Sequence, residues 1–135
     1  MESRTDQMPS ISMMLVEDEK ITLELLATIL ARKYPNVNLY TAINGKNGLE
    51  IFKTHTPDIV ITDINMPDMG GVQMANKIRA IKQDTKIIVL SGDSERLYLQ
   101  DSVKKGFESN HNIMKPLNFD VLFAAIEECL SEIAQ

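Results

Sequence analysis

The fold is decided by the stretch Ile59-Val60-Ile61-Thr62-Asp63-Ile64-Asn65-Met66-Pro67-Asp68-Met69-Gly70-Gly71. Its first half is a run of apolar and β-branched residues, and its second half is rich in turn-forming Pro and Gly. This order predicts a buried strand that ends in a loop. Asp63 then stands at the C-terminal end of the strand, where a carboxylate is available for chemistry.

Four further strands are predicted on either side of this stretch. Apolar runs at residues 11–16 and 86–90, and a shorter one at residues 112–114, have the composition of buried strands. The segment 37–41 alternates apolar and polar residues, which is typical of a strand with one less buried face. Continuous apolar strands are expected in parallel sheets whose two faces are both covered by helices.

Helices are predicted between the strands, because apolar residues recur there at three- and four-residue steps. The turn Asn44-Gly45 precedes the second helix, Gly106 is expected to end the fourth, and Asn118 to cap the last. In chain order the expected apolar faces are Ile21, Leu25, Leu26, Ile29 and Leu30; Leu49, Ile51 and Phe52; Val72, Met74, Ala75, Ile78 and Ile81; Leu97, Tyr98 and Val103; and Leu122, Ile126, Cys129 and Ile133.

Strand and helix therefore alternate five times. This pattern predicts an α/β fold with a five-stranded parallel sheet and five helices, doubly wound and flavodoxin-like. We expect residues 11–135 to form one domain and residues 1–10 to be a flexible N-terminal tail. In such sheets ligands bind at the carboxyl ends of the strands, near the point where the strand order reverses.

Composition narrows the class of protein. The chain of 135 residues has 44% hydrophobic and 24% charged residues and a net charge of −5, with no cluster of Lys and Arg. These features argue against direct nucleic-acid binding and favour protein partners. Its apolar runs are too short to cross a membrane and no signal peptide is recognisable, so we expect a cytoplasmic protein. The single Cys129 excludes an internal disulfide and is expected to be a buried apolar residue.

A chemically coherent set of residues follows the predicted strands. Glu17 and Asp18 follow the first strand, Asp63 ends the third, and Ser91 and Lys115 follow the last two. Two carboxylates about 4 Å apart repel by about 4 kcal/mol at an effective dielectric near 20, which calls for a cation. Oxygen ligands alone favour Mg²⁺ or Mn²⁺ over zinc. A carboxylate nucleophile, a metal, a lysine and a hydroxyl donor together match the needs of phosphoryl transfer.

These residues carry a resemblance to a known family. Glu17-Asp18, the pattern Asp63-x-x-Met66-Pro67-x-Met69-x-Gly71, Ser91 and Lys115-Pro116 resemble the receiver domain of two-component response regulators, from about Ile11 to the last helix. The resemblance implies that Asp63 accepts a phosphoryl group from a histidine kinase or phosphotransfer protein. It also implies that Mg²⁺ is held by Glu17, Asp18, Asp63 and the backbone carbonyl of Asn65.

The resemblance further implies a signalling switch, which promotes only its own phosphorylation and dephosphorylation and is not otherwise an enzyme. Lys115 would pair with Asp63 and then with the phosphoryl group, and Ser91 would be the hydroxyl that moves towards it. The Lys115-Pro116 bond would be cis, and Asn65 and Asp93 would tune hydrolysis. The fourth helix, fifth strand and fifth helix would form the surface read by a downstream protein or a linked output domain.

The sequence departs from the family at one position that matters for the switch. The family usually has an aromatic residue three positions before the lysine, whereas this chain has Asn112, preceded by His111. Phe107 is a candidate to fill the vacated space. The segment between Gly106 and Lys115 is also long, which predicts either a slipped register or a bulge at this edge. A lone loop histidine such as His111 is expected to be solvated.

Two other functions stay open on the sequence. One is a phosphorylation-independent adaptor that keeps the receiver fold for docking. The other is a flavodoxin-like binder of a small molecule, although its phosphate loop should be rich in Ser, Thr and Gly where this chain has Glu17-Asp18-Glu19. The sequence also leaves open whether the receiver acts alone or within a longer protein.

Overall fold

The computed structural model describes residues 10–134 of the chain, so the expected tail at residues 1–10 lies almost wholly outside the described residues. The alternation of strands and helices is confirmed. In order, the elements are β1 Ser12–Val16, α2 Lys20–Lys33, β2 Asn38–Ala42, α3 Gly45–His55, β3 Ile59–Asp63, α4 Gly71–Ile81, β4 Lys86–Ser91, the 3-10 turn η1 Asp93–Glu95, α5 Arg96–Lys104, β5 His111–Met114 and α6 Phe119–Ala134.

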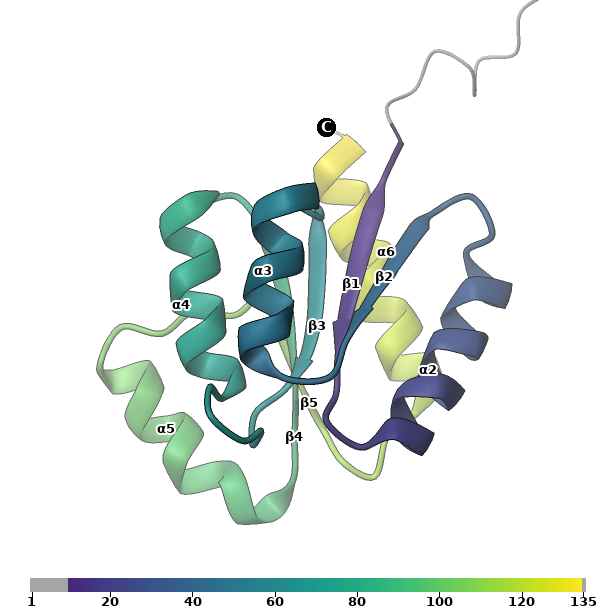
Figure 1. Ribbon diagram of the computed structural model, residues 1–135. Helices are drawn as coiled ribbons and strands as arrows, with labels where there is room; N and C mark the ends of the chain where they lie inside the picture. The colour runs from purple at the N-terminus through teal and green to yellow at the C-terminus, as the bar shows by residue number, and fades with distance from the viewer. Residues whose placement is uncertain (1–9, 135) are drawn as a thin grey trace, which may run out of the picture.

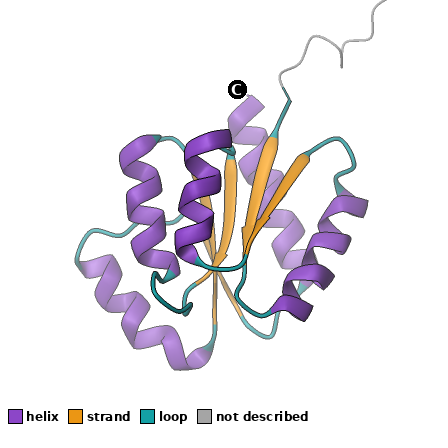
Figure 2. Ribbon diagram, viewed as in Figure 1, coloured by secondary structure: helices purple, strands orange, loops and turns teal. Residues whose placement is uncertain are grey.

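The five strands form one parallel sheet in the order β2-β1-β3-β4-β5 (Figures 1 and 2). Helices α3, α4 and α5 cover one face of the sheet, and α2 and α6 cover the other (Figure 1). The predicted doubly wound α/β fold is therefore confirmed. The chain turns outward from β1 to β2 and then crosses back to β3, so the strand order reverses between β1 and β3. Ligands bind at such a reversal.

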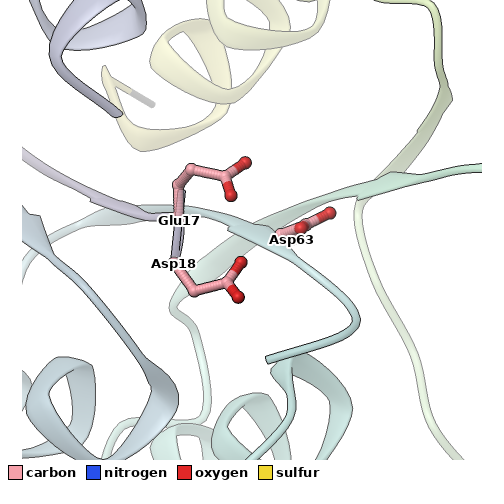
Figure 3. A group of neighbouring side chains, drawn as sticks. All are labelled: Glu17, Asp18 and Asp63. Atoms are coloured by element: carbon pink, nitrogen blue, oxygen red, sulfur yellow. The ribbon is translucent and has the colours of Figure 1, made fainter. Parts of the chain in front are cut away.

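The register of β1 and β3 brings acidic residues together at this point. Val16 pairs with Thr62, so the next residues along the two strands, Glu17 and Asp63, leave the sheet side by side. Asp18 follows Glu17 in the same loop, and the three side chains lie around one gap in Figure 3. The site therefore depends on the alignment of two neighbouring parallel strands.

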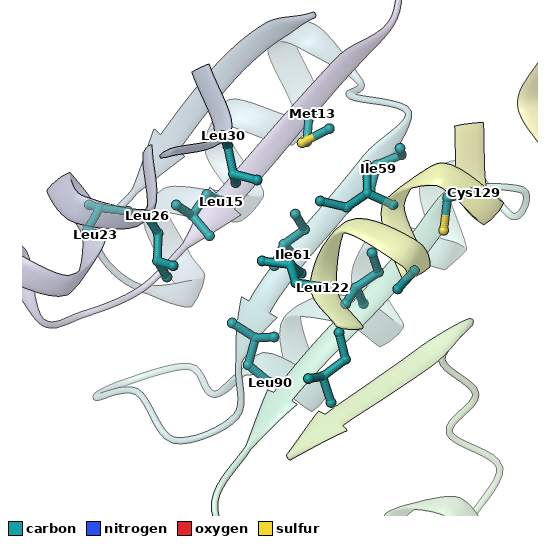
Figure 4. Packing of buried hydrophobic residues seen from close by; sticks show 14 residues of the cluster. Met13, Leu15, Leu23, Leu26, Leu30, Ile59, Ile61, Leu90, Leu122 and Cys129 are labelled. Atoms are coloured by element: carbon teal, nitrogen blue, oxygen red, sulfur yellow. The ribbon is translucent and has the colours of Figure 1, made fainter. Parts of the chain in front are cut away.

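Two hydrophobic clusters hold the layers together. Since successive strand residues point to opposite faces, β3 supplies Ile59 and Ile61 to one cluster and Val60 to the other. The first cluster packs the sheet against α2 and α6 (Figure 4) and includes Leu26, Leu30, Leu122, Ile126 and Cys129. The second packs the sheet against α3, α4 and α5 and includes Phe52, Met74, Ile78, Leu99 and Phe107. Every residue of β3 is buried.

The predicted apolar face of α2 was wrong in part. Leu23, Leu26 and Leu30 are its buried residues. Ile21 and Leu25 instead have 75% and 56% of their surface exposed. Apolar residues occupy a wider part of the helix surface than the sheet can bury. The three- and four-residue spacing is therefore compatible with more than one buried face.

The predicted face of α5 was wrong throughout. Leu97, Tyr98 and Val103 are exposed, whereas Leu99 and Ser102 are buried. The helix has only 9 residues and packs near the edge of the sheet, so little of its surface is covered. On such a short helix, three adjacent apolar residues do not reveal which one faces inward.

The predicted cap of α6 and the predicted stop of α5 are confirmed, whereas the predicted turn before α3 is wrong. Asn118 caps α6, since its Oδ1 accepts hydrogen bonds from the backbone N–H groups of Asp120 at 2.9 Å and Val121 at 3.2 Å. Gly106 follows α5 with a left-handed φ of 105°, as expected of a helix stop. Asn44-Gly45 is not a separate turn, because Asn44 caps α3 and Gly45 is its first residue.

The edge strand β5 is regular. Its residues pair in register with β4 from Ile88 and His111 to Ser91 and Met114, so the expected slip or bulge is absent over these residues. His111 belongs to the strand rather than to a loop, and its Nε2 lies 4.0 Å from Glu128 Oε1.

Two further expectations concern burial and the membrane. Cys129 is fully buried, and burial together with the Glu132 carboxylate raises the pKa of its thiol to about 11. Among residues 10–134, no helix has the length and apolar character needed to cross a bilayer.

Candidate functional site

An ion pair forms the centre of the site. Asp63 is the last residue of β3 and is 6% exposed, and Lys115 lies in the loop after β5. Lys115 Nζ lies 2.6 Å from Asp63 Oδ1. The Lys115 backbone N–H donates to the Ser91 carbonyl at 2.8 Å, and the Lys115–Pro116 peptide bond is cis, as the resemblance implied. Two strands that are not adjacent in the sheet are thus linked across the end of β4.

Glu17 and Asp18 complete an acidic cluster with Asp63 (Figure 3). One carboxylate oxygen from each of the three residues lies within 4.8 Å of the others. Glu17 is buried and its Oε2 accepts the backbone N–H of Glu19 at 3.0 Å, whereas Asp18 is exposed. The donors are oxygens alone, which fits Mg²⁺ or Mn²⁺, and the exposed side leaves room for the waters that Mg²⁺ retains.

The pKa values reflect an excess of negative charge. Burial raises the pKa of Asp63, although Lys115 opposes the shift. Burial also raises the pKa of Glu17, and repulsion from Asp63 adds to the effect. For Lys115, burial lowers the pKa, but the pairing with Asp63 and the charges of Glu17 and Glu95 outweigh it and raise the pKa overall. One lysine does not neutralise this cluster, so a bound cation would stabilise its ionised form.

The Ser91 hydroxyl is engaged by the edge strand β5. Ser91 ends β4 and is 1% exposed. Its Oγ donates to Asn112 Oδ1 at 2.9 Å, and Met114 Sδ lies 3.5 Å away. Both partners belong to β5. The position expected to hold an aromatic ring is therefore occupied by an acceptor for the Ser91 hydroxyl.

Asn65 and Asp93 lie on the surface around this centre. Asn65 is exposed in the loop after β3. Asp93 begins η1, its side chain is 88% exposed, and its Oδ1 lies 3.3 Å from Arg96 Nη2. Their roles in hydrolysis remain predictions.

Sequence reasoning missed Glu95. This carboxylate is only 8% exposed and accepts the backbone N–H of Gly92 at 2.6 Å. Its charge contributes to raising the pKa of both Asp63 and Lys115, so it acts on the centre of the site. A signal was present, because a Glu three residues after a turn residue at a helix start often reaches back to that residue's N–H.

A cleft of about 530 Å³ opens beside Asp63. It is lined by the acidic residues and Lys115, and by apolar residues that include Leu25, Leu117 and Phe119. Asp63 is mostly buried yet lies on an open cleft, so a reactant can approach it from outside.

Comparison with known proteins identifies the family. The family model described as the response regulator receiver domain matches residues 13–127. The chain belongs to the response regulator receiver domain family. A receiver domain is a signalling switch of two-component systems rather than a conventional enzyme, and the acidic cluster is compatible with metal binding and phosphorylation.

Transcriptional regulators are among the relatives of this receiver domain. It is 33% identical over 121 residues to the uncharacterized transcriptional regulatory protein YesN of Bacillus subtilis, covering 89% of this chain and 32% of YesN. It is 31% identical over 115 residues to the cell cycle transcriptional regulator CtrA of Caulobacter vibrioides, covering 84% of this chain and 47% of CtrA. The chain thus spans less than half of these relatives.

Solved receiver structures share the fold. The response regulator TrrA of Thermotoga maritima, in complex with Mg²⁺ and BeF, superposes with a TM-score of 0.75 at 32% identity and covers 88% of this chain and 98% of that chain. A receiver domain from Clostridium thermocellum superposes with a TM-score of 0.81 at 24% identity, covering 92% and 97% of the two chains.

Proposed function

We propose that Asp63 is the phosphoacceptor of a two-component or phosphorelay system and takes its phosphoryl group from a histidine kinase or phosphotransfer protein. The observation that carries the proposal is the Asp63–Lys115 ion pair beside Glu17 and Asp18 at the point where the strand order reverses. An Asp63 oxygen would attack the phosphorus of a phosphohistidine. The new P–O bond forms as the P–N bond breaks, and the imidazole leaves.

The neighbouring residues supply what this transfer needs. Lys115 is already paired with Asp63 and would neutralise charge on the phosphoryl oxygens afterwards. Glu17, Asp18, Asp63 and the backbone carbonyl of Asn65 would hold Mg²⁺, with Mn²⁺ as an alternative. When bound, the metal supplies charge neutralisation at the phosphoryl oxygens. Asn65 and Asp93 flank the site and would tune hydrolysis by positioning water.

Phosphorylation would then shift the population of two conformers. Phosphorylation replaces the −1 carboxylate with an acyl phosphate that carries about −1.5 to −2 charge and three acceptor oxygens, which favour the conformer in which Ser91 and Lys115 close on it. The surface formed by α5, β5 and α6 would present the state to a downstream protein or a linked output domain. We assign this function to one receiver domain over residues 11–135, acting in the cytoplasm without direct contact with nucleic acid or membrane.

The proposal is tested by chemical phosphorylation. Incubation with acetyl phosphate and Mg²⁺ is expected to add one phosphoryl group, measured by intact-protein mass spectrometry, and excess chelator should prevent the addition. A protein that takes up no phosphoryl group from acetyl phosphate or from phosphorylated phosphotransfer proteins would instead support the phosphorylation-independent docking adaptor.

Magnesium is expected to stabilise the folded protein. At a free Mg²⁺ concentration ten times the Kd, ligand linkage contributes about 1.4 kcal/mol. For a domain of this size, this corresponds to an increase of about 5 °C in the midpoint of thermal unfolding. Asp18→Asn should remove most of this increase, because it removes the charge of a proposed metal ligand. Asp18 is exposed, so the substitution should not disturb the core.

Thermal unfolding in chelator and in Mg²⁺ measures both effects. Asp68→Asn is the matched control, since Asp68 is exposed and has the left-handed φ of 68° that Asn tolerates well. If Mg²⁺ leaves the wild-type midpoint unchanged, or if both variants respond alike, these carboxylates do not form the metal site.

A further inference from the structure

We propose that Asn112 and Glu95 form a polar lock on the end of β4, and that phosphorylation of Asp63 opens the lock by drawing away its two donors, Ser91 Oγ and Gly92 N–H. The inference rests on the proposed function of Asp63. It assigns positioning roles to two residues, one of which stands where receiver domains usually have an aromatic ring. We call this pair of residues the β4 lock.

In one half of the lock, Asn112 accepts the hydrogen bond of the Ser91 hydroxyl, the group that would have to move towards the phosphoryl group. Ser91 is 1% exposed, and its Oγ donates to Asn112 Oδ1 at 2.9 Å. A hydroxyl has a single hydrogen, so Ser91 cannot donate to a phosphoryl oxygen while it donates to Asn112. Met114 Sδ, at 3.5 Å, is a weaker acceptor for the same group. Ser91 must therefore leave Asn112 before it can close on Asp63.

The Glu95 half holds the next donor along the chain. Glu95 Oε1 accepts the Gly92 N–H at 2.6 Å, and the Glu95 N–H donates to the Gly92 carbonyl at 3.1 Å. This reciprocal pair closes the loop between β4 and α5. Because Glu95 is 8% exposed, its charge is only weakly screened by solvent.

Electrostatics favour opening the lock after phosphorylation. Asp63 pairs with Leu90 near the end of β4 and Glu95 lies in the turn that follows this strand, so two buried carboxylates of like charge face the same end of the sheet before any transfer. Phosphorylation replaces the −1 charge of the Asp63 carboxylate with an acyl phosphate of about −1.5 to −2 charge, while Glu95 stays in place. Phosphoryl oxygens are also strong, charge-assisted acceptors. The Ser91 hydroxyl and the Gly92 N–H would exchange their present acceptors for phosphoryl oxygens, and the greater negative charge at Asp63 favours this exchange.

The lock connects the site to α5. Glu95 immediately precedes Arg96, the first residue of that helix, so a displacement of Glu95 moves the start of α5. Phe107 does not take over the aromatic position on β5, because it follows α5 and is buried in the cluster beneath α3, α4 and α5. Polar contacts to β5 and η1 would therefore perform the relay in this chain.

The lock is tested by titrating the full chain with beryllofluoride in Mg²⁺ and following backbone amide signals by NMR. Asn112→Ala removes one acceptor, and Glu95→Gln removes one charge. Either variant is expected to tighten apparent beryllofluoride affinity about threefold to tenfold, the effect of one lost resting-state hydrogen bond or repulsion. Without beryllofluoride, the Gly92 and Leu97 amide signals should already be shifted towards their wild-type bound positions.

Matched controls separate the lock from general effects. Asn38→Ala makes the same change at an exposed position on β2, the opposite edge strand, and Glu50→Gln makes the same charge change on the exposed surface of α3. Both are expected to keep wild-type affinity. Asn112→Val, which suits an edge strand, provides a second variant if Asn112→Ala does not unfold cooperatively.

The outcomes distinguish the two proposals. Wild-type affinity or weaker binding in Asn112→Ala and Glu95→Gln would overturn the lock while leaving the phosphoacceptor proposal intact. A wild-type protein that does not bind beryllofluoride in Mg²⁺ would refute the proposed function, and the lock with it.

Discussion

Asp63→Asn is expected to abolish phosphorylation of this protein by acetyl phosphate. The amide keeps the size of the side chain but has no carboxylate oxygen to attack phosphorus. It also removes the charge that holds Lys115 Nζ at 2.6 Å. Because the nucleophile itself is lost, we expect the signal for the phosphorylated protein to fall to background rather than to decrease by degrees.

The loss is measured by intact-protein mass spectrometry in Mg²⁺, with the wild type treated in parallel. Asp68→Asn makes the same chemical change five positions along the same loop and should be labelled like the wild type. Amide NMR spectra verify that both variants are folded. Undiminished labelling of Asp63→Asn would show that another residue accepts the phosphoryl group and would contradict the site.

Gly71→Ala is expected to destabilise the protein by about 3 kcal/mol, the upper part of the usual range for overpacking. A Cβ atom on Gly71 would lie 2.0 Å from the carbonyl oxygen and 3.1 Å from the carbonyl carbon of Asp63. These are backbone atoms, so no side-chain rotation relieves the collision. The higher helix propensity of Ala, worth about 1 kcal/mol, does not compensate for it.

The added Cβ would collide with Asp63, the proposed phosphoacceptor. Gly71 is the first residue of α4, and its N–H donates to the Ile64 carbonyl at 2.8 Å, closing the loop that follows Asp63. Moving α4 away would displace Asp63 from Lys115. We therefore expect slower phosphorylation as well as reduced stability.

Urea unfolding monitored by circular dichroism measures the free energy. Gly92→Ala is the control, because a Cβ on Gly92 would make only an ordinary van der Waals contact, 3.5 Å from Glu95 Oε1. If the free energy of unfolding of Gly71→Ala lies within about 0.5 kcal/mol of the wild-type value, the usual range for surface substitutions, the prediction is wrong and α4 can shift without destabilising the protein.

The sequence predicts the fold and the central residues for the same physical reason. Fully buried parallel strands require apolar runs such as Ile59–Asp63, and polar residues directly after such runs must gather at one edge of the sheet. The sequence pattern therefore predicts that four charged residues lie close together, and in the structure they do: Glu17, Asp18, Asp63 and Lys115.

Features that depend on one face of a helix, or on contacts between distant segments, were not predictable in this way. Leu97 and Leu99 are equally apolar, and only the tertiary packing of α5 decides that Leu99 is buried. The hydrogen bond between Ser91 and Asn112 depends on the pairing of Ser91 with Met114 on the neighbouring strand. Sequence alone showed only that an aromatic residue was missing.

The buried thiol makes this protein convenient for site-specific spectroscopy. The chain has one cysteine and no tryptophan. Cys129 is inaccessible, and with a pKa of about 11 its reactive thiolate is a very small fraction at neutral pH. A cysteine placed at Leu97, which is 78% exposed on α5, would therefore be alkylated selectively in the native protein. A single fluorophore at that position could report the movement of α5 without background from Cys129 or from native indole emission.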